Sequence, residues 1–188
     1  MKINANSIRA GNVLMHNNRL YIVSKTPEHT KPGKGGAFVQ VEMKDIKTGT
    51  KLNERFSSTV DVERVKLDQR EYQFLYIEEN KIVLMDLENY EQMEVDSGLI
   101  GEKKIFLQDG MQVTVESYEG SPISIELPET VVATVVETEP VVKGQTATAS
   151  YKPAILDNGL RVMVPPFVNT EDKLVIRTED TSYVERAK

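Results

Sequence analysis

Every second residue is apolar in Ala37-Phe38-Val39-Gln40-Val41-Glu42-Met43. Side chains of a β-strand point alternately to its two faces, so these apolar side chains would share one face and pack against a core. The alternation returns in Met111-Gln112-Val113-Thr114-Val115-Glu116-Ser117-Tyr118. Both stretches therefore predict strands of antiparallel sheets with one buried face.

Turn signals separate further short stretches rich in Val, Ile, Tyr and Thr along the whole chain. They are Asn17-Asn18, Thr48-Gly49, Glu79-Asn80, Asp109-Gly110, Glu119-Gly120 and Asn158-Gly159. This spacing predicts an all-β fold. One short helix is expected near residues 97–107, where Ser97 is the candidate N-cap and apolar residues follow at imperfect helical spacing.

Charge and a Leu-Pro pair at residues 127–128 divide the chain into residues 1–65, 66–128 and 129–188. The first segment holds 11 Lys or Arg and 6 Asp or Glu, a net charge of +5. The second segment holds 5 Lys or Arg and 14 Asp or Glu, a net charge of −9. The third segment holds 7 Lys or Arg and 9 Asp or Glu, a net charge of −2. We expect each segment to form a small barrel, and five-stranded oligonucleotide-binding (OB) barrels fit the last two. A β-sandwich is the competing architecture.

The composition argues against several classes of function. No apolar run approaches the ~20 residues of a membrane helix, and the first ten residues lack a signal-peptide pattern, so we expect a cytoplasmic protein without a membrane partner. The chain has no cysteine, which excludes disulfides and thiolate metal sites. The acidic residues lack calcium-loop spacing, so no metal or cofactor is expected. The net charge of −6 disfavours general nucleic-acid binding, and any RNA contact should concentrate in the basic first segment.

The most unusual local sequence is Lys31-Pro32-Gly33-Lys34-Gly35-Gly36. It lies between a strand expected to end near Lys25 and one beginning at Ala37, so we expect a hairpin tip. Pro32 fixes its backbone φ and the glycines carry no side chains, so Lys34 would project from a slender turn. The spacing of a phosphate-binding P-loop is absent. On the loop alone, an ordinary hairpin with a solvated lysine is the favoured interpretation.

The carboxy-terminal stretch from Lys152 to Val168 reads Lys152-Pro153-Ala154-Ile155-Leu156-Asp157-Asn158-Gly159-Leu160-Arg161-Val162-Met163-Val164-Pro165-Pro166-Phe167-Val168. This stretch resembles the signature of the elongation factor P family. Further features of that family recur in register: Arg9-Ala10-Gly11, the Pro-Gly-Lys-Gly tip, and Gly120-Ser121-Pro122-Ile123-Ser124 followed by Pro128. The resemblance therefore covers essentially the whole chain.

The resemblance implies a KOW/SH3-like barrel followed by two OB barrels, in an elongated shape like the L of transfer RNA. It implies a non-enzymatic translation factor that binds the 70S ribosome between the peptidyl and exit sites, contacts ribosomal RNA and relieves stalling at consecutive prolines. Lys34 would contact the CCA end of peptidyl-tRNA, after a modifying enzyme has extended it, most simply with β-lysine. A monomer without a dissociable cofactor is expected.

Other positions are carried over from the family. Gly144-Gln145-Thr146 matches a Gly-Asp-Thr loop that approaches the exit-site codon of the messenger RNA, and Gln145 replaces the usual Asp, which leaves any codon preference open. Tyr183 and Arg186 match a Tyr-x-x-Arg ending that is implied to contact the ribosome or transfer RNA. A strand aromatic and a surface arginine are the alternative for this pair. His29, close to the tip, is expected to be exposed or to contact RNA rather than to catalyse.

Three other functions remain open. An elongation-factor-P-like paralogue would share the architecture, although the intact Pro-Gly-Lys-Gly tip disfavours it. A generic RNA-binding β-barrel protein would bind many RNAs with strong salt dependence. A hydrolase would need a nucleophile and a base, and the sequence shows no motif that supplies them.

Overall fold

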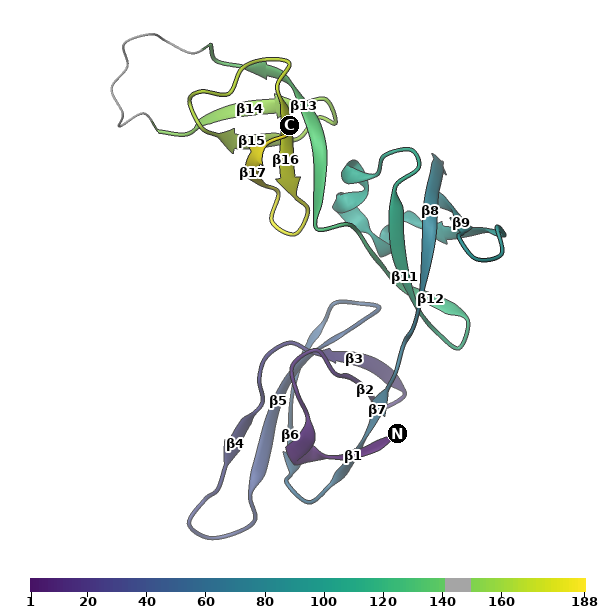
Figure 1. The fold of residues 1–188 in the computed structure, drawn as a ribbon. Helices are drawn as coiled ribbons and strands as arrows, with labels where there is room; N and C mark the ends of the chain where they lie inside the picture. The colour runs from purple at the N-terminus through teal and green to yellow at the C-terminus, as the bar shows by residue number, and fades with distance from the viewer. Residues whose placement is uncertain (141–149) are drawn as a thin grey trace. The chain divides into compact units, whose positions relative to one another are not determined.

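The computed structural model describes residues 1–140 and 150–188. Within them the chain forms three antiparallel sheets of seven, five and five strands, which confirms the all-β prediction (Figure 1). By contacts, the chain divides into two compact units. One is Met1–Gln69 with Glu116–Ile123, and the other is Arg70–Val115 with Ser124–Lys188. The division at residues 65 and 128 and the transfer-RNA-like outline stay predictions.

The first sheet contains seven strands and one short 3₁₀ turn. They are β1 (Lys2–Asn4), η1 (Ala5–Ser7), β2 (Val13–His16), β3 (Arg19–Val23), β4 (Glu28–Thr30), β5 (Phe38–Asp45), β6 (Lys51–Ser57) and β7 (Asp61–Val65). The strand order is β1-β7-β2-β3-β5-β4, and β6 pairs with the other edge of β5. The predicted turn at Asn17-Asn18 joins β2 to β3. Both residues have positive φ, 50° and 60°, as a tight two-residue hairpin requires.

Strand β5 follows the alternation read from the sequence. Val39, Val41 and Met43 are fully buried, whereas the residues between them face outward. The core they join also holds buried Ile8 and Leu14. The prediction of one buried face is therefore confirmed for this strand.

The second sheet consists of β8 (Asp68–Glu78), β9 (Lys81–Asp86), β10 (Gln92–Asp96), β11 (Gln112–Tyr118) and β12 (Ser121–Glu126). The expected helix is present only as two 3₁₀ turns, η2 (Ser97–Leu99) and η3 (Gly101–Phe106). Asp96, not Ser97, is the N-cap, because its side chain accepts a hydrogen bond from the Gly98 N–H at 2.7 Å. Gly101, with φ of 61°, interrupts the helical backbone, which explains why no α-helix forms.

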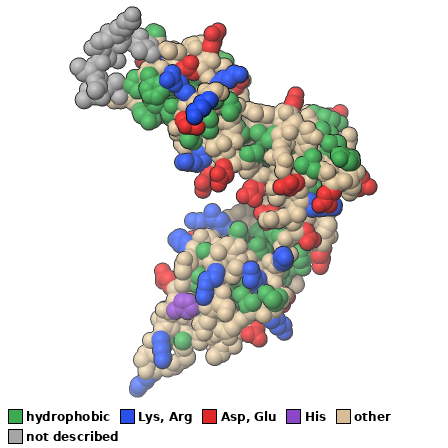
Figure 2. Space-filling view, in the orientation of Figure 1, with side chains coloured by type: hydrophobic (Ala, Val, Ile, Leu, Met, Phe, Trp, Pro, Cys, Tyr) green, Lys and Arg blue, Asp and Glu red, His purple; other side chains and the backbone are tan. Residues whose placement is uncertain are grey.

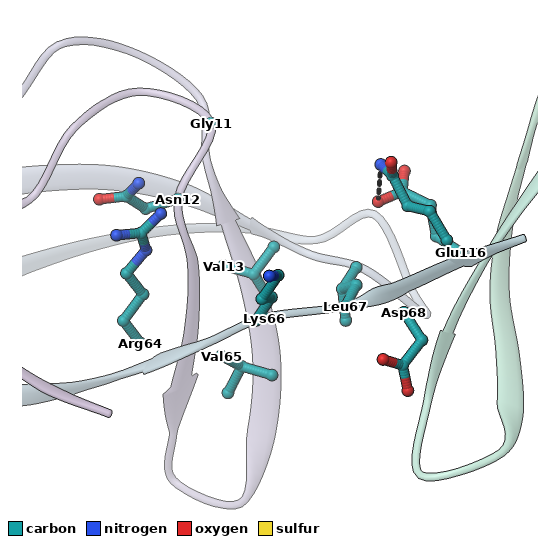
Figure 3. Close-up of a pocket in the computed structure, with 10 residues that line it drawn as sticks. Gly11, Asn12, Val13, Arg64, Val65, Lys66, Leu67, Asp68 and Glu116 are labelled. Carbon is teal, nitrogen blue, oxygen red and sulfur yellow. Dashed lines mark hydrogen bonds between the residues drawn. The ribbon is translucent and has the colours of Figure 1, made fainter.

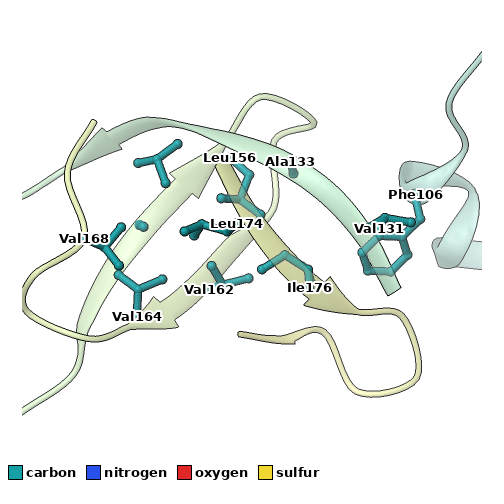
Figure 4. Close-up of a cluster of buried hydrophobic side chains, with 11 residues drawn as sticks. Phe106, Val131, Ala133, Leu156, Val162, Val164, Val168, Leu174 and Ile176 are labelled. Carbon is teal, nitrogen blue, oxygen red and sulfur yellow. The ribbon is translucent and has the colours of Figure 1, made fainter. Parts of the chain in front are cut away.

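The third sheet consists of β13 (Thr130–Thr138), β14 (Lys152–Leu156), β15 (Arg161–Val164), β16 (Lys173–Arg177) and β17 (Ser182–Arg186). Strands β14 and β15 are the hairpin predicted from the Asn158-Gly159 turn. Phe106 of η3 lies in the core of this sheet, beside Val131 (Figure 4). Met111 and Leu127 pack against the cores of both the second and the third sheet. The second and third sheets thus share apolar contacts. Such contacts add stability, which small domains have little of on their own.

A buried aspartate shapes the hairpin between β5 and β6. Asp45 is 5% exposed and accepts hydrogen bonds from the N–H groups of Lys47 (2.8 Å) and Thr48 (3.2 Å) and from the Arg19 guanidinium (3.2 Å). Burial by itself raises the pKa of Asp45, but the bonds from Thr48, Lys47 and Arg19 outweigh burial and hold the pKa below its ordinary value of 3.8. The carboxylate therefore stabilises the fold in its charged form.

The second sheet repeats this arrangement between β9 and β10. Asp86 is 3% exposed and accepts from the N–H groups of Glu88 (2.7 Å) and Asn89 (3.4 Å). Arg70 lies 3.0 Å from its other oxygen. In both hairpins an aspartate closes the turn and an arginine of a neighbouring strand neutralises it.

We predict that Phe106→Ala lowers the free energy of unfolding by about 3 kcal/mol, because it leaves a cavity in the core of the third sheet. The measurement is urea denaturation followed by circular dichroism. Met163→Ala is the control, since Met163 is 51% exposed and its truncation should cost less than about 1 kcal/mol. An equal effect of the two substitutions would show that Phe106 does not anchor this core.

We predict that Asp45→Asn lowers stability by about 2 kcal/mol at pH 7, because an amide pairs less well with Arg19 and the two N–H groups. Asp45 has a depressed folded pKa, so its stabilisation is complete above 3.8 and is lost as the pH falls through the folded pKa. The gap between wild type and variant should therefore close on acidification. Urea denaturation at several pH values tests this, with exposed Asp61→Asn as control. A gap that is constant with pH would contradict the prediction.

Candidate functional site

The candidate site is a hairpin that extends from the first sheet, formed by β4, residues 31–37 and the start of β5 (Figure 1). Glu28 pairs with Gln40, and Thr30 pairs with Phe38. The sequence placed the preceding strand end near Lys25. This was wrong, because β3 ends at Val23 and β4 follows it, so the hairpin is longer than expected. We call residues 28–40 the finger.

Lys34 lies at the tip of the finger and is exposed. Its ammonium makes no hydrogen bond or ion pair with any residue in the described ranges. Figure 2 shows Lys or Arg side chains at the free end of the hairpin that projects from the first sheet. The tip therefore presents positive charge to the surroundings and is not packed into its own sheet.

The glycines of the tip differ in what they require. Gly35 has φ of 105°, a backbone conformation that side chains disfavour. Gly33 and Gly36 do not have positive φ, and a Cβ atom on either would meet nothing within 4 Å. Only Gly35 therefore has a backbone conformation that favours glycine. Gly33 and Gly36 have no side chains, which keeps the tip narrow.

The base of the finger is tied to the neighbouring strand. The Arg55 guanidinium of β6 lies over the Phe38 ring, 5.2 Å from its centroid. On the other face Val39 is fully buried in the core. The Phe38–Arg55 contact was not predicted from the sequence, because recognising it requires the β5–β6 register.

The two histidines occupy different environments. His29 lies on β4 and is exposed, and it makes no hydrogen bond or ion pair within the part of the chain that the structure describes. His16 is half-buried, with Nε2 3.5 Å from Glu54 Oε2. Its ring packs edge-on against Phe56 and Tyr21, at 5.5 and 6.1 Å between centroids. His16 is thus part of the packing of the first sheet.

Tyr183 and Arg186, the two residues of the predicted Tyr-x-x-Arg ending, have different surroundings. Tyr183 is half-buried against the core of the third sheet, and burial raises its pKa. Arg186 lies 4.8 Å from the Phe167 ring centroid and 3.9 Å from Asp172. Its stacking partner was not foreseen, although Phe167 belongs to the carboxy-terminal signature. Gly144, Gln145 and Thr146 lie outside the described residues.

A wide hollow of about 490 Å³ lies near the end of β7 (Figure 3). It is lined by Gly11, Asn12, Val13, Arg64, Val65, Lys66, Leu67, Asp68, Gln69 and Glu116. Across it the Gln69 side chain donates to Glu116 at 3.4 Å. None of these ten residues is Ser, Thr, Cys or His, so the lining holds no hydroxyl or thiol nucleophile of these types and no imidazole.

The described residues also bear on metal binding and membrane insertion. Outside residues 141–149, no group of three or more His, Cys, Asp or Glu side chains is placed to hold a metal ion. Among the same residues, no helix is long and apolar enough to cross a membrane.

Family models match three consecutive parts of the chain. Residues 4–62 match the elongation factor P KOW-like domain, residues 67–125 match the elongation factor P OB domain, and residues 131–186 match the elongation factor P C-terminal model. Together with the sheets, these matches confirm the predicted fold class of a KOW-like barrel followed by OB barrels.

Solved structures agree with this fold. Eukaryotic translation initiation factor 5A from Methanococcus jannaschii superposes with a TM-score of 0.56 at 26% identity, over 68% of this chain and 94% of that one. An initiation factor 5A family protein from Naegleria fowleri superposes with a TM-score of 0.53 at 18% identity, over 68% of this chain and 98% of that one. This second likeness supports the fold alone.

Curated relatives match over their full length. Elongation factor P of Rickettsia bellii (strain OSU 85-389) is 58% identical over 188 residues, which is 100% of both chains. Elongation factor P of Rickettsia africae (strain ESF-5) is 57% identical over the same span. The chain therefore belongs to the elongation factor P family of translation elongation factors.

Proposed function

We propose that this chain binds the 70S ribosome between the peptidyl and exit sites and promotes peptide-bond formation at consecutive prolines. Lys34 acts there by contacting the CCA end of peptidyl-tRNA. The observation that supports this most is the exposed, unpaired Lys34 at the end of a slender finger. A side chain in that position can enter a narrow RNA-walled cavity, which a lysine on the face of a barrel cannot do.

The proposed mechanism is positioning. Proline has a fixed φ and a secondary amine, so it reacts slowly unless the two substrates are well aligned. Holding a reactant in a productive geometry can supply several kcal/mol of the barrier. Lys34 therefore needs no proton transfer. An ammonium that donates to phosphate and ribose oxygens of the CCA end is sufficient.

The tip also suits a covalent modification. Lys34 is accessible to a modifying enzyme, and no described side chain shields it. Transfer of an activated β-lysyl group to the deprotonated Nζ of Lys34 would form an amide, with release of the activating group and one proton, and would move the cationic end further from the backbone. The extended arm would reach deeper into the cavity while the finger stays the same width.

Further partners follow from the same function. We propose that the chain acts as a monomer in the cytoplasm, that the loop with Gly144, Gln145 and Thr146 approaches the exit-site codon of the messenger RNA, and that Tyr183 and Arg186 contact the ribosome or transfer RNA. Arg186 is 52% exposed, so its guanidinium keeps donors for such a contact. His29 flanks the same RNA as the finger.

We predict that Lys34→Ala abolishes the rescue of proline-run synthesis and leaves the fold intact, because Lys34 is exposed and has no hydrogen-bond or ion-pair partner among the described residues. Reconstituted translation of a reporter with consecutive prolines measures rescue, and the melting temperature measures folding. Lys31→Ala is the control within the same loop, and at saturating factor it should retain most of the rescue. Full rescue by the Lys34→Ala protein would disprove the role of the tip.

We predict that protein purified from its native host carries added mass on the peptide that contains Lys34. Intact-mass and peptide mass spectrometry would detect it, and β-lysylation predicts the mass of one lysyl residue. The Lys34→Ala protein from the same host should lack the addition. A native wild-type chain that is entirely unmodified would contradict this prediction, whereas the rescue assay would still test Lys34 itself.

A further inference from the structure

The turn between β14 and β15 contains the residue pair in which asparagine loses its side-chain amide most readily. The chain has ten asparagines, and only Asn158 is followed by a glycine. Glycine has no Cβ atom to shield its backbone nitrogen or to restrict its rotation. That nitrogen can therefore attack the preceding side-chain amide more easily than the nitrogen of a larger residue. Asn158 is thus the asparagine that the sequence makes most prone to deamidation.

The folded turn engages both groups that would react. The Gly159 N–H, whose nitrogen would be the nucleophile, donates a hydrogen bond to the Leu156 carbonyl at 2.9 Å. The Asn158 side-chain oxygen, on the carbon that would be attacked, accepts a hydrogen bond from the Leu160 N–H at 3.1 Å. Ring closure needs a free Gly159 nitrogen and an Asn158 amide that has turned onto it. Both hydrogen bonds must therefore break before the two residues can react.

Contacts on either side of the turn hold it closed. The Asp157 N–H donates to the Thr134 carbonyl at 2.8 Å, and the Asp157 carboxylate accepts from the Thr134 N–H at 3.3 Å. On the other side, Leu160 is half-buried and packs against the core of the third sheet. Gly159 itself is exposed and has φ of 87°, which suits glycine. Water therefore reaches the turn, whereas opening the turn would break these contacts.

We propose that Asn158 is a site of spontaneous deamidation and that the closed turn between β14 and β15 restrains it, so the folded chain reacts only when this turn opens locally. The Gly159 nitrogen then loses its proton to solvent and bonds to Asn158 Cγ, the Cγ–Nδ2 bond breaks, and ammonia leaves after taking up a proton. Water hydrolyses the resulting succinimide at either carbonyl, which yields an aspartyl or an isoaspartyl residue. This inference is independent of the proposed function.

The two products affect the turn differently. An aspartyl residue keeps a side-chain oxygen that can accept from the Leu160 N–H, and it adds a negative charge beside Asp157. An isoaspartyl residue carries the main chain through its Cβ atom, which lengthens the loop of residues 157–159 by a backbone atom. A short hairpin loop sets the pairing register of its strands, and here the Leu156 N–H donates to the Leu160 carbonyl at 2.9 Å across the loop. The isoaspartyl product should weaken this hydrogen bond and destabilise the third sheet.

The first test compares the full chain in native buffer and in guanidinium chloride, at the same pH and temperature. Peptide mass spectrometry follows the replacement of the side-chain amino group by hydroxyl at each asparagine. In denaturant Asn158 should react before the other asparagines, and Gly159→Ala should slow its reaction. In native buffer Asn158 should react at least about tenfold more slowly than in denaturant, because it waits for local opening. Another asparagine that reacts first in denaturant would disprove the site, and equal rates would disprove the restraint.

Hydrogen exchange measures the same opening without the chemistry. The Gly159 N–H must leave the Leu156 carbonyl both to exchange with solvent and to react. The slowing of deamidation in native buffer should therefore be at least as large as the protection factor of the Gly159 amide. A smaller slowing would mean that Asn158 reacts inside the closed turn, which contradicts the proposal.

Two variants should loosen the turn while they keep the Asn158-Gly159 pair. Leu160→Ala removes the apolar contact with the core, and Asp157→Ala removes the carboxylate that accepts from Thr134. Each variant should raise the native rate severalfold relative to its own rate in denaturant. Met163→Ala, at an exposed position of β15, is the control and should leave this ratio unchanged. The ratio of wild type in both turn variants would rule out control by the turn.

Low denaturant concentrations separate local opening from global unfolding. A local opening exposes little surface, so the native rate should change only slightly with guanidinium chloride below the unfolding transition. A steep rise from the lowest concentrations would show that global unfolding controls the reaction, and the proposal would fail. Asp157 is exposed, so Asp157→Ala should keep the fold and allow this measurement even where Leu160→Ala does not fold.

The products provide the last measurement. Chromatography separates the aspartyl from the isoaspartyl form of the aged full chain, and each form is then unfolded in urea. The isoaspartyl form should unfold at the lower urea concentration, because its loop no longer fits the strand register. Equal midpoints for the two forms would contradict the predicted effect on the third sheet.

Discussion

Strand β5 is the constraint on which the finger depends, because one continuous strand serves both the core and the tip. Val39, Val41 and Met43 are fully buried, and the backbone pairs with β6 along one edge and with β3 and β4 along the other. A Gly-rich loop alone would have no fixed direction, since its residues make few contacts. Because β5 is hydrogen-bonded along both edges, the position at which the loop joins the strand is fixed. The exposure of Lys34 is thus compatible with order at its base.

Small sheets need support beyond their own cores, and the chain supplies it in two ways. In the second and third sheets, Phe106, Met111 and Leu127 contribute to apolar contacts that the two sheets share. In the first two sheets, a buried aspartate and an arginine close a hairpin in the same way. The turn residue four positions after the aspartate is Gly49 in one hairpin and Tyr90 in the other, both with positive φ (73° and 62°). Because the same turn tolerates a non-glycine residue, the aspartate bonds and not the glycine define it.

Sequence patterns predicted what depends on neighbours along the chain. The alternation from Ala37 to Met43 predicted the buried face of β5, and the run of Pro and Gly around Lys34 predicted an exposed tip. Strand β4 escaped prediction because Glu28, His29 and Thr30 are all exposed, so they show no alternation, and only pairing with β5 makes them a strand. The cap at Asp96 was missed for a similar reason, since Ser97 and Asp96 both suit the position and backbone geometry selects between them. The Phe38–Arg55 and Phe167–Arg186 contacts join residues that are distant in sequence, and no local pattern reports them.

The distribution of charge is compatible with the contact that we propose between an acidic protein and RNA. A net charge of −6 opposes approach to a polyanion in general, because repulsion acts over about 10 Å at moderate ionic strength. The first 65 residues reverse the sign locally to +5, and within them Lys34, at the end of the finger, has no described ion-pair partner. On the proposed function, this segment would attract RNA, whereas the acidic second segment would repel it. On the proposed function, orientation is selected before Lys34 reaches its target, so the negative residues contribute to specificity as much as the positive ones do.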